Sequence, residues 1–486
     1  MDFSFIRWEL AVAALAMIIL LADLFLPAIS GRALGLMAAL GLGLFLTCSF
    51  CFGSGLPASS GRVETAHGFY VLDHLAVWAK QFSMLATLLT ILMSVRFLDK
   101  EENCCAEYFF LQLTGCLGMM LLASAADFVS MFIALELMTI GFFVLVSFQR
   151  RNILCLESGV KYLIYGALSS GILLYGVVLI YGATGETSFA KVAFYSVANP
   201  NSILLLAGLV LVLIGIGFKI SAVPFHWWTA DVYEGAPTPT VALLSIGSKG
   251  AGFVLLIRVL IEAFPSYRLH WFPLVCFASG ASILVGSLGA LSQGNLKRLM
   301  GYSSISHTGY MLLGIAASSV LGLSSVLYYL LAYLLASALV FGAMCETAVE
   351  NPRQDIRRYS GLVGRSNWVA GALMLGLLSL SGIPPLAGFF GKVLVFRSVL
   401  EHATMAHSFL ILLGIAVIGV VCSLYYYLGV IRTMYFTDTP EDGQPVDIAR
   451  PVQWIFGVLM VAVIAVGFYQ SPWWKASATA ISALHP

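Results

Sequence analysis

The chain has 486 residues, of which 60% are hydrophobic and only 10% are charged, and its formal net charge is +1. This composition excludes a soluble protein and predicts a membrane protein with many spanning helices. The balanced charge also argues against nucleic-acid binding, which requires a basic patch.

Apolar runs of at least roughly 17 residues, the length that crosses the hydrocarbon core, predict about fourteen transmembrane helices. The connections between them are loop-sized and leave no room for a soluble domain. The predicted fold class is therefore an all-α polytopic membrane protein. The predicted helices begin near Leu10, Ala33, Leu75, Tyr108, Phe128, Gly159, Ser202, Thr238, Phe272, Leu299, Ser324, Trp368, Ser408 and Trp454.

Basic residues are unevenly divided between the two sides of these helices. Loops after odd-numbered helices hold 13 of the 25 lysines and arginines, whereas the opposite side holds 5. The positive-inside rule places the richer side in the cytoplasm. Both termini are therefore predicted to lie on the outer side of the membrane.

The other seven basic residues lie inside predicted helices. Inserting a charged side chain at the centre of a membrane helix costs roughly 2.5–3.5 kcal/mol on insertion scales. Three of them are near helix ends, and we expect their side chains to reach the interface by snorkelling. These three are Lys80, Arg258 and Arg397. The remaining four need a functional explanation. They are Lys161, Lys219, Lys249 and Lys392.

Glu136 lies in the middle of the fifth predicted helix, within the run FVSMFIALELMTI. A carboxylate buried there stays charged only beside a cation, and Lys219 or Lys161 is the natural partner. The pair could be a static structural ion pair. We favour a pair whose strength changes as protons pass, because the protonation of each group depends on the other.

The seventh predicted helix, from Ser202 to Ala236, is too long for one straight span. Its 35 residues would extend about 52 Å as a helix, whereas the hydrocarbon core is about 30 Å thick. Pro224 removes a backbone donor and disfavours helix at the residue before it, which predicts two half-helices. Lys219 and His226 lie on either side of this break.

The twelfth predicted helix, Trp368–Leu400, repeats this plan. Its 33 residues contain Gly382, Pro384, Pro385 and Gly388 near the middle, and Lys392 follows them. Paired discontinuous helices are typical of inverted-repeat transporters, whose sites lie near the membrane midplane. The sequence therefore predicts two five-helix repeats, from the fourth to the eighth helix and from the ninth to the thirteenth.

Lys249 and Lys392 are each surrounded by glycines, so that backbone or water can approach the ammonium closely. Buried lysines can exchange protons reversibly, and we favour a relay role over a purely structural one for both. His226 and His307 could bridge gaps between lysines, since imidazole accepts a proton on one nitrogen and donates from the other. The alternative for each histidine is ordinary packing.

Several common chemistries have no motif in this sequence. Cys48 and Cys51 have CxxC spacing but no second pair, and Cys104 and Cys105 are adjacent, which does not support a zinc or iron–sulfur site. Neither a phosphate-binding loop nor a convincing dinucleotide fingerprint is present. The chain is therefore expected to hold no metal and no redox cofactor of its own.

Three long motifs resemble the hallmark sequences of the antiporter-like membrane subunits of respiratory complex I. They are PFHWWTADVYEGAPTPT from Pro224, NLKRLMGYSSISHTGYML from Asn295 and SLSGIPPLAGFFGKVLVF from Ser379. Within the family the chain is most similar to the N-type subunits of NADH:quinone oxidoreductase. Lys392 stands where M-type subunits are expected to have glutamate, and no long lateral helix of the L type follows. Ala230 and Gly301 are small departures from the pattern.

The resemblance implies a fold and a division of the chain. It implies fourteen helices with broken seventh and twelfth helices in two inverted repeats. Three N-terminal helices would occupy residues 1–107, the first repeat (helices 4–8) residues 108–261, the second repeat (helices 9–13) residues 262–432, and a loop with the last helix residues 433–486.

The resemblance also implies roles for the ionisable residues. Glu136 and Lys219 would form the charge pair of the first half-channel, Lys249 the central relay, and Lys392 would face the exit. Lys161 and His307 would extend the chain of water and side chains. His226 is a further relay candidate because it lies beside the helix break.

The implied activity is outward proton pumping in a bacterial inner membrane, driven by NADH oxidation and quinone reduction in other subunits. Those subunits would carry FMN, iron–sulfur clusters and quinone, and subunits M and K would be neighbours. Three alternatives stay open. The chain could be a cation/proton antiporter subunit of the same superfamily, a subunit of a related complex with another electron donor, or a structural spacer.

Overall fold

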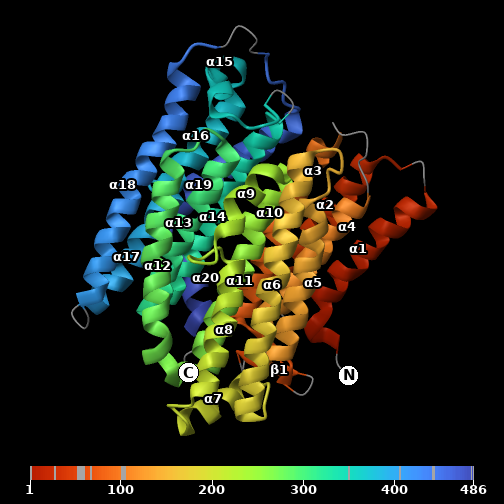
Figure 1. Ribbon diagram of the computed structural model, residues 1–486. Helices are drawn as coiled ribbons and strands as arrows, with labels where there is room; N and C mark the ends of the chain where they lie inside the picture. Colours follow the sequence, from red (N-terminus) through yellow and green to blue (C-terminus); the bar gives the residue numbers. More distant parts are fainter. Residues whose placement is uncertain are drawn as a thin grey trace. The chain divides into compact units, whose positions relative to one another are not determined.

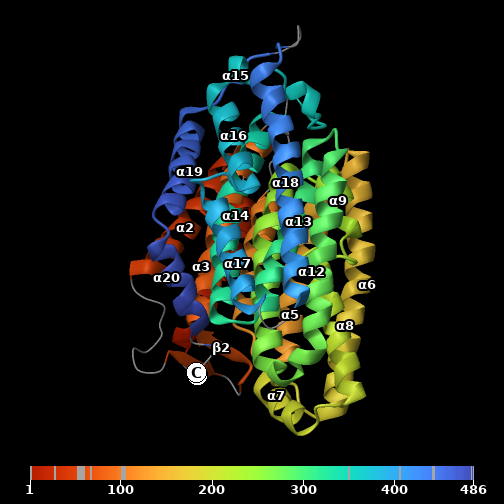
Figure 2. The same ribbon diagram turned by 90° about the vertical axis from the view of Figure 1, so that its left-hand side faces the viewer.

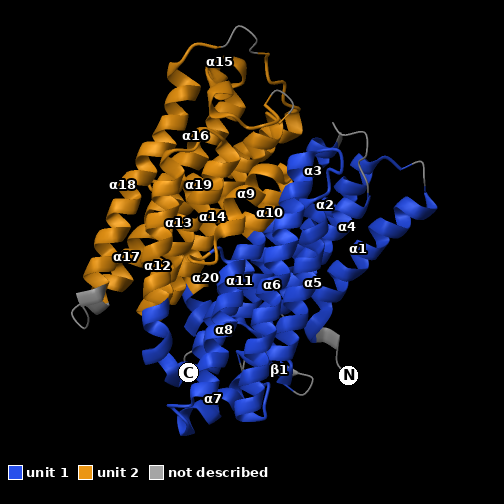
Figure 3. Cartoon of the chain, viewed as in Figure 1, with its two compact units in different colours: residues 1–221, 247–274, 478–486 blue, residues 222–246, 275–477 orange. Residues whose placement is uncertain are grey.

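The computed structural model describes residues 3–26, 29–51, 61–65, 68–99, 106–348, 351–403, 407–439, 444–482 and 484. Within these ranges eleven helices are long and apolar enough to cross a membrane. The chain is therefore an all-α polytopic membrane protein, as predicted, whereas the count of fourteen and the inverted repeats stay predictions. Cys104 and Cys105 lie outside the described residues. The chain forms two compact units, which are coloured separately in Figure 3.

Unit 1 consists of residues 1–221, 247–274 and 478–486. Its helices pack as neighbours along the chain, α1 on α2, α2 on α3, α3 on α4, α4 on α5, α5 on α6 and α6 on α8 (Figure 1). The helices are η1 Phe3–Ile6, α1 Arg7–Phe25, α2 Gly31–Cys51, α3 His74–Asp99, α4 Ala106–Ala123, α5 Phe128–Val146, α6 Ile153–Thr184, α7 Phe189–Ala198, α8 Ile203–Lys219, α11 Lys249–Arg258, η4 Val259–Ala263 and η5 Pro265–Tyr267.

Glycines allow the closest helix pairs of unit 1 to form. A Cβ atom at Gly176 of α6 would lie 2.8 Å from the carbonyl oxygen of Gly208 in α8, and one at Gly118 of α4 would lie 2.7 Å from the backbone nitrogen of Met138 in α5. Lipid tails are as apolar as helix surfaces, so helices associate in a membrane by this kind of close packing. These glycines therefore allow α6 to lie close against α8, and α4 close against α5.

Unit 1 also contains elements that the sequence reasoning missed. The connection before α3 forms an antiparallel hairpin of β1 (Arg62–Thr65) and β2 (Tyr70–Asp73), in which Arg62 pairs with Asp73 and Thr65 with Tyr70. We had predicted only a loop there, because four-residue strands leave too short an alternating pattern to recognise. The short helix α7 was missed because its 10 residues fall below the length of about 17 apolar residues that predicts a membrane-spanning helix.

Unit 2 consists of residues 222–246 and 275–477. Its centre is α14, whose side chains from Gly322 to Glu346 are all buried except that of Leu331, and which contacts α10, α13, α16, α17 and α19 (Figure 2). The helices are α9 Trp227–Gly235, α10 Thr238–Leu243, α13 Leu296–Ala317, α14 Val320–Glu346, η6 Ile356–Tyr359, α15 Leu362–Arg365, α16 Asn367–Ser381, α17 Ala387–Ala403, α18 His407–Phe436 and α19 Arg450–Phe468. The division between the units falls within α12 Arg268–Leu291 and α20 Ser471–Ser482.

Both predicted helix breaks are present. Helix α8 ends at Lys219 and helical structure resumes at Trp227, and α16 ends at Ser381 and is followed by α17 from Ala387. Each break begins with a residue in the left-handed region, Ser221 with φ of 60° and Gly382 with φ of 87°. The prolines explain why a helix cannot continue through these segments, because they lack a backbone donor.

The eighth predicted helix, from Thr238 to Ala263, has an irregularity that the sequence did not indicate. It contains two π-helical turns, η3 (Leu244–Ser248) and η4 (Val259–Ala263), at the two ends of α11. Lys249 is the first residue of α11 and Arg258 is its last. Such π turns are frequent at functional sites. Both ends of this helix are therefore candidate functional positions.

Arg258, which we expected to snorkel, is instead fully buried in unit 1. Its guanidinium donates to both oxygens of Asp73, at 2.7 and 3.0 Å, and lies 2.5 Å from Glu262. Burial raises the pKa of the Asp73 carboxyl, but the adjacent Arg258 lowers it by more and leaves it below its usual range. The prediction was wrong because the counter-charge belongs to β2, 185 residues away in sequence.

Lys80 is a second correction to the expected snorkelling. Its side chain is 3% exposed and its ammonium lies 2.7 Å from a carboxylate oxygen of Glu9 in α1. Arg397, in contrast, is 65% exposed beside Glu401, and its snorkelling stays a prediction. The three side chains differ because only Lys80 and Arg258 meet a carboxylate in the interior.

We expect Arg258→Met to destabilise unit 1 by about 3–5 kcal/mol, because Asp73 and Glu262 would lose their buried cation. Thermal denaturation of the purified protein in detergent measures this loss. Adding Asp73→Leu should recover part of it, since a buried carboxylate without a partner is then removed. The control is Arg397→Met, which removes an exposed pair and should change stability by no more than about 1 kcal/mol. Equal effects of Arg258→Met and Arg397→Met would contradict the prediction.

Candidate functional site

Glu136 lies near the middle of α5 and is partly buried against α6. Its Oε1 accepts a hydrogen bond of 2.5 Å from the hydroxyl of Ser170. The close packing of α5 on α6 places this hydroxyl opposite the carboxylate. Glu136 is therefore held by a neutral donor in unit 1.

Lys219 is the last residue of α8 and is 4% exposed. Its Nζ donates a hydrogen bond of 2.5 Å to Thr139 Oγ1 of α5, and it lies 5.5 Å from the centre of the Phe218 ring. Thr139 is three residues after Glu136, so the lysine approaches the same face of α5 that carries the carboxylate. The Glu136 charge acts on the ammonium, but the direct partners of both groups are hydroxyls.

Lys161 has a different setting from Lys219. It lies on α6, its side chain is 36% exposed, and its ammonium is 2.7 Å from Glu157 one turn earlier. Of the two partners that the sequence offered for Glu136, the structure brings Lys219 to the same face of α5 and pairs Lys161 with Glu157.

Lys249 is 1% exposed at the first position of α11, directly after a π turn. The next glycines let this helix approach its neighbours in unit 1. A Cβ atom at Gly250 would lie 2.2 Å from a ring carbon of Phe82 in α3, and one at Gly252 would lie 2.8 Å from Ile220 and 3.7 Å from the Cβ of Lys219. The predicted close approach of backbone beside Lys249 is therefore present, and it brings α11 alongside the end of α8.

His307 lies on α13 in unit 2 and is 3% exposed. Its Nδ1 is 2.7 Å from the hydroxyl of Tyr329, and its Nε2 is 3.3 Å from the hydroxyl of Tyr427, which in turn bonds Ser303. Either ring nitrogen can carry the proton, because a tyrosine hydroxyl can both donate and accept. The imidazole is therefore bridged by hydroxyls on both sides.

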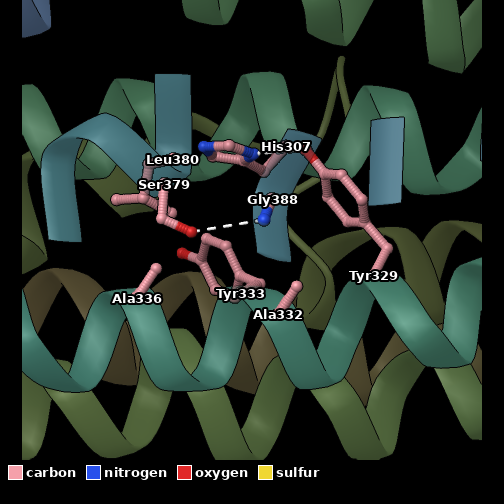
Figure 4. Close-up of a pocket in the computed structure, with 8 residues that line it drawn as sticks. All are labelled: His307, Tyr329, Ala332, Tyr333, Ala336, Ser379, Leu380 and Gly388. Carbon is pink, nitrogen blue, oxygen red and sulfur yellow. Dashed lines mark hydrogen bonds between the residues drawn. The ribbon is translucent and has the colours of Figure 1, made fainter. Parts of the chain in front are cut away.

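A small cavity of about 10 Å³ adjoins this histidine, which is space for about one water molecule. Figure 4 shows His307, Tyr329 and Tyr333 around it, with Gly388 donating its backbone N–H to Ser379 Oγ at 3.2 Å. The cavity is lined by His307, Tyr329, Ala332, Tyr333, Ala336, Ser379, Leu380 and Gly388.

Lys392 lies on α17 and is 4% exposed. Its Nζ donates to the backbone carbonyls of Leu380 and Ser381, at 3.0 and 2.8 Å, and lies 5.2 Å from the centre of the Tyr310 ring. These carbonyls end α16, where a helix leaves acceptors unpaired and its dipole favours a cation. The second helix break therefore supplies the binding site for this ammonium.

His226 and the acidic residues of α9 lie in unit 2. The His226 ring stacks on Trp227 with centroids 5.0 Å apart, and its Nδ1 is buried with no hydrogen-bond partner among the described residues. Asp231 and Glu234 both bind the guanidinium of Arg298, at 2.8 and 2.7 Å. This ion-pair cluster connects α9 to α13 within unit 2.

Buried tyrosines are the functional residues that the sequence reasoning missed. Several buried tyrosine hydroxyls bond polar groups inside unit 2. Tyr333 lies 2.6 Å from Ser245 Oγ, and Tyr233 lies 3.3 Å from Ser304 Oγ. Tyrosines in the middle of apolar helices, as in the run SVLYYLLAYLL, were the signal that could have identified them.

Metal ligands do not gather at these sites. In the part of the chain that the structure describes, no group of three or more histidine, cysteine, aspartate or glutamate side chains could hold an ion. The arrangement instead offers buried ammonium groups, an imidazole and hydroxyls, which can bind and transfer protons.

The chain is similar to known membrane subunits over nearly its whole length. The family model described as NADH:quinone oxidoreductase/Mrp antiporter, TM, matches residues 125–419. NADH-quinone oxidoreductase subunit N of Desulforamulus reducens is 37% identical over 471 residues, which are 97% of this chain and 96% of that protein. The subunit of the same name from Moorella thermoacetica is 38% identical over 464 residues, 96% and 95% of the two chains.

Solved structures share the fold. A chain of respiratory complex I from Thermus thermophilus has a TM-score of 0.80 and 29% identity, and the match covers 97% of this chain and 99% of that one. A chain of the Mrp complex from Dietzia has a TM-score of 0.83 over 100% and 98% of the two chains. It is only 22% identical, so it supports the fold alone.

Gly382→Ala is expected to destabilise unit 2 by at least about 1 kcal/mol, because φ at this position favours glycine and a Cβ atom would lie 3.0 Å from Lys392 Cδ. The matched control is Gly371→Ala in the middle of α16, where the nearest atom would be 3.9 Å away. That change should be neutral or slightly stabilising. Thermal denaturation in detergent compares the two, and similar stabilities would contradict the assignment.

Proposed function

The chain belongs to the family of NADH:quinone oxidoreductase and Mrp antiporter membrane subunits, and we propose that it carries protons across the membrane through its buried lysines and histidines as the N-type subunit of an NADH:quinone oxidoreductase. The relatives with the nearly full-length matches bear the name of that subunit. They favour this function over that of an Mrp-type antiporter.

The observation that carries the proposal is the kind of partner that each buried ammonium has. Lys219 donates to a threonine hydroxyl and Lys392 to two backbone carbonyls, whereas Lys80 lies 2.7 Å from a carboxylate. Neutral acceptors stabilise an ammonium less than a carboxylate in direct contact does, so the proton can leave at a smaller cost. Lys219 and Lys392 are therefore suited to proton exchange, and Lys80 to a stable pair.

In unit 1, Glu136 modulates this exchange from a distance. Its charge favours the ammonium form of Lys219 without a direct ion pair, and a change in its own protonation alters that preference. Lys249, at the π turn, is the central relay of the proposal. Lys161 and His226 are assigned supporting roles as further proton carriers.

In unit 2, His307 and Lys392 carry the later steps of the relay. The imidazole can accept a proton on one nitrogen and release one from the other, with Tyr329 and Tyr427 at the two nitrogens. Lys392 faces the exit half-channel in this proposal.

The redox chemistry belongs to other subunits in this proposal. NADH oxidation and quinone reduction, with their FMN and iron–sulfur clusters, supply the energy, and M-type and K-type subunits are the expected neighbours. The excess of basic residues in loops after odd-numbered predicted helices supports the further proposal that both chain termini lie on the outer side of a bacterial inner membrane.

Lys219→Ala tests the proposed function directly. In membrane vesicles with the assembled complex, we expect proton pumping and quinone reduction to fall together by about 10²-fold, because one positioned proton carrier is lost. Lys191→Ala removes an exposed lysine that pairs with Glu186, and it should leave both rates unchanged. Wild-type pumping by Lys219→Ala in an assembled complex would falsify the relay.

Tyr329→Phe removes only the hydroxyl that lies 2.7 Å from His307. We expect this change to slow proton transfer by about 10²-fold, while Tyr328→Phe is the control. Tyr328 is the preceding residue of the same helix, and its hydroxyl donates to the Val466 carbonyl at 2.9 Å instead. Proton pumping measured with both variants distinguishes them, and equal pumping would exclude a role for the Tyr329 hydroxyl.

A further inference from the structure

Helix α3 has a buried face made of polar residues in the N-terminal part of unit 1. Lys80, Ser83, Thr87, Thr90 and Ser94 follow one another at alternating spacings of three and four residues, and none is more than 3% exposed. This spacing places one of them on the same face at every turn. We call these five residues the α3 polar face. It lies before residue 125, where the family match begins.

The α3 polar face is long enough to cross much of the membrane. Fourteen residues separate Lys80 from Ser94, which corresponds to about 21 Å of helix beside a hydrocarbon core of about 30 Å. At one end Lys80 binds Glu9 of α1 at 2.7 Å. At the other end Ser94 accepts a hydrogen bond of 2.9 Å from the side-chain amide of Gln112 in α4.

Some polar side chains of the α3 polar face form their hydrogen bonds within the helix itself. The hydroxyls of Ser83, Thr90 and Ser94 each donate to a backbone carbonyl one turn earlier, at 2.8, 2.9 and 2.6 Å. Small hydroxyl residues of this kind also assist helix packing in membranes. These three residues alone would therefore require no ligand.

Two other buried atoms have no hydrogen-bond partner among the described residues: Glu9 Oε2 and Gln112 Oε1. A third, the Thr87 hydroxyl, faces the thiol of Cys116, which is a weak donor. These three groups lie at both ends and near the middle of the α3 polar face. A buried polar atom left in this state costs about 1–3 kcal/mol, and buried water usually supplies the missing bond. Their positions therefore indicate water molecules along the face.

We propose that the α3 polar face holds a file of water molecules and forms a second proton path in this chain, distinct from the residues around Lys219. Protons pass along this file from one water molecule to the next, each oxygen releasing one proton as it accepts another, while the fixed Lys80–Glu9 pair holds the water at one end. The inference rests on the proposed function in one respect, that protons are the ion moved.

The test uses Thr87→Val in the assembled complex, because valine keeps the volume and removes the hydroxyl at the centre of the face. We expect the protons pumped per NADH to fall by about one, since a block in one path removes the protons it carries. Thr87→Ser should pump normally. Thr47→Val is the control for the same change at an exposed site on α2.

An electron-microscopy map of the wild-type complex at a resolution that shows ordered water gives an independent readout. Water bonded to Thr87 and Gln112 is expected, and a dry face would overturn the proposal. Wild-type pumping by Thr87→Val would overturn it as well. If Thr87→Val does not assemble, Gln112→Leu at the other end is measured in its place.

Lys219→Ala, measured in the same vesicles, separates this inference from the proposed function. Loss of pumping by Lys219→Ala with normal pumping by Thr87→Val rejects only the second path. Normal pumping by Lys219→Ala with reduced pumping by Thr87→Val rejects only the relay through Lys219.

Discussion

A charge inside the membrane must be held by specific partners, and the rest of this structure depends on how each charge meets that requirement. Arg258 and Lys80 are held by carboxylates in direct contact. Lys219 and Lys392 are held by a hydroxyl and by backbone carbonyls. A carboxylate in direct contact stabilises an ammonium more than a neutral acceptor does, and the proposed function depends on this difference.

The helix breaks follow from the same requirement. A helix interior offers no unpaired backbone acceptor, but a helix end does. The break after Ser381 exposes two carbonyls to Lys392, and α8 ends at Lys219 itself.

Hydroxyl groups connect the ionisable residues in both units. In unit 1 Ser170 and Thr139 stand beside Glu136 and Lys219, and in unit 2 two tyrosines flank His307. A hydroxyl can donate and accept at once, so it can pass a proton while leaving the charges in place. This shared chemistry explains why small polar residues matter here as much as the charged ones.

Much of the fold was determined by the sequence itself. Hydropathy and prolines act locally, so the membrane class, the helix starts and both broken helices could be predicted. Of the four lysines that the sequence singled out, Lys219, Lys249 and Lys392 are buried and Lys161 is 36% exposed. The side chains that bind these charged groups could not be predicted from the sequence, because Thr139 is 80 residues from Lys219 and Asp73 is 185 residues from Arg258. The hairpin and the π turns leave no strong local pattern. Only tertiary packing decided which buried charges meet a carboxylate and which meet a neutral acceptor.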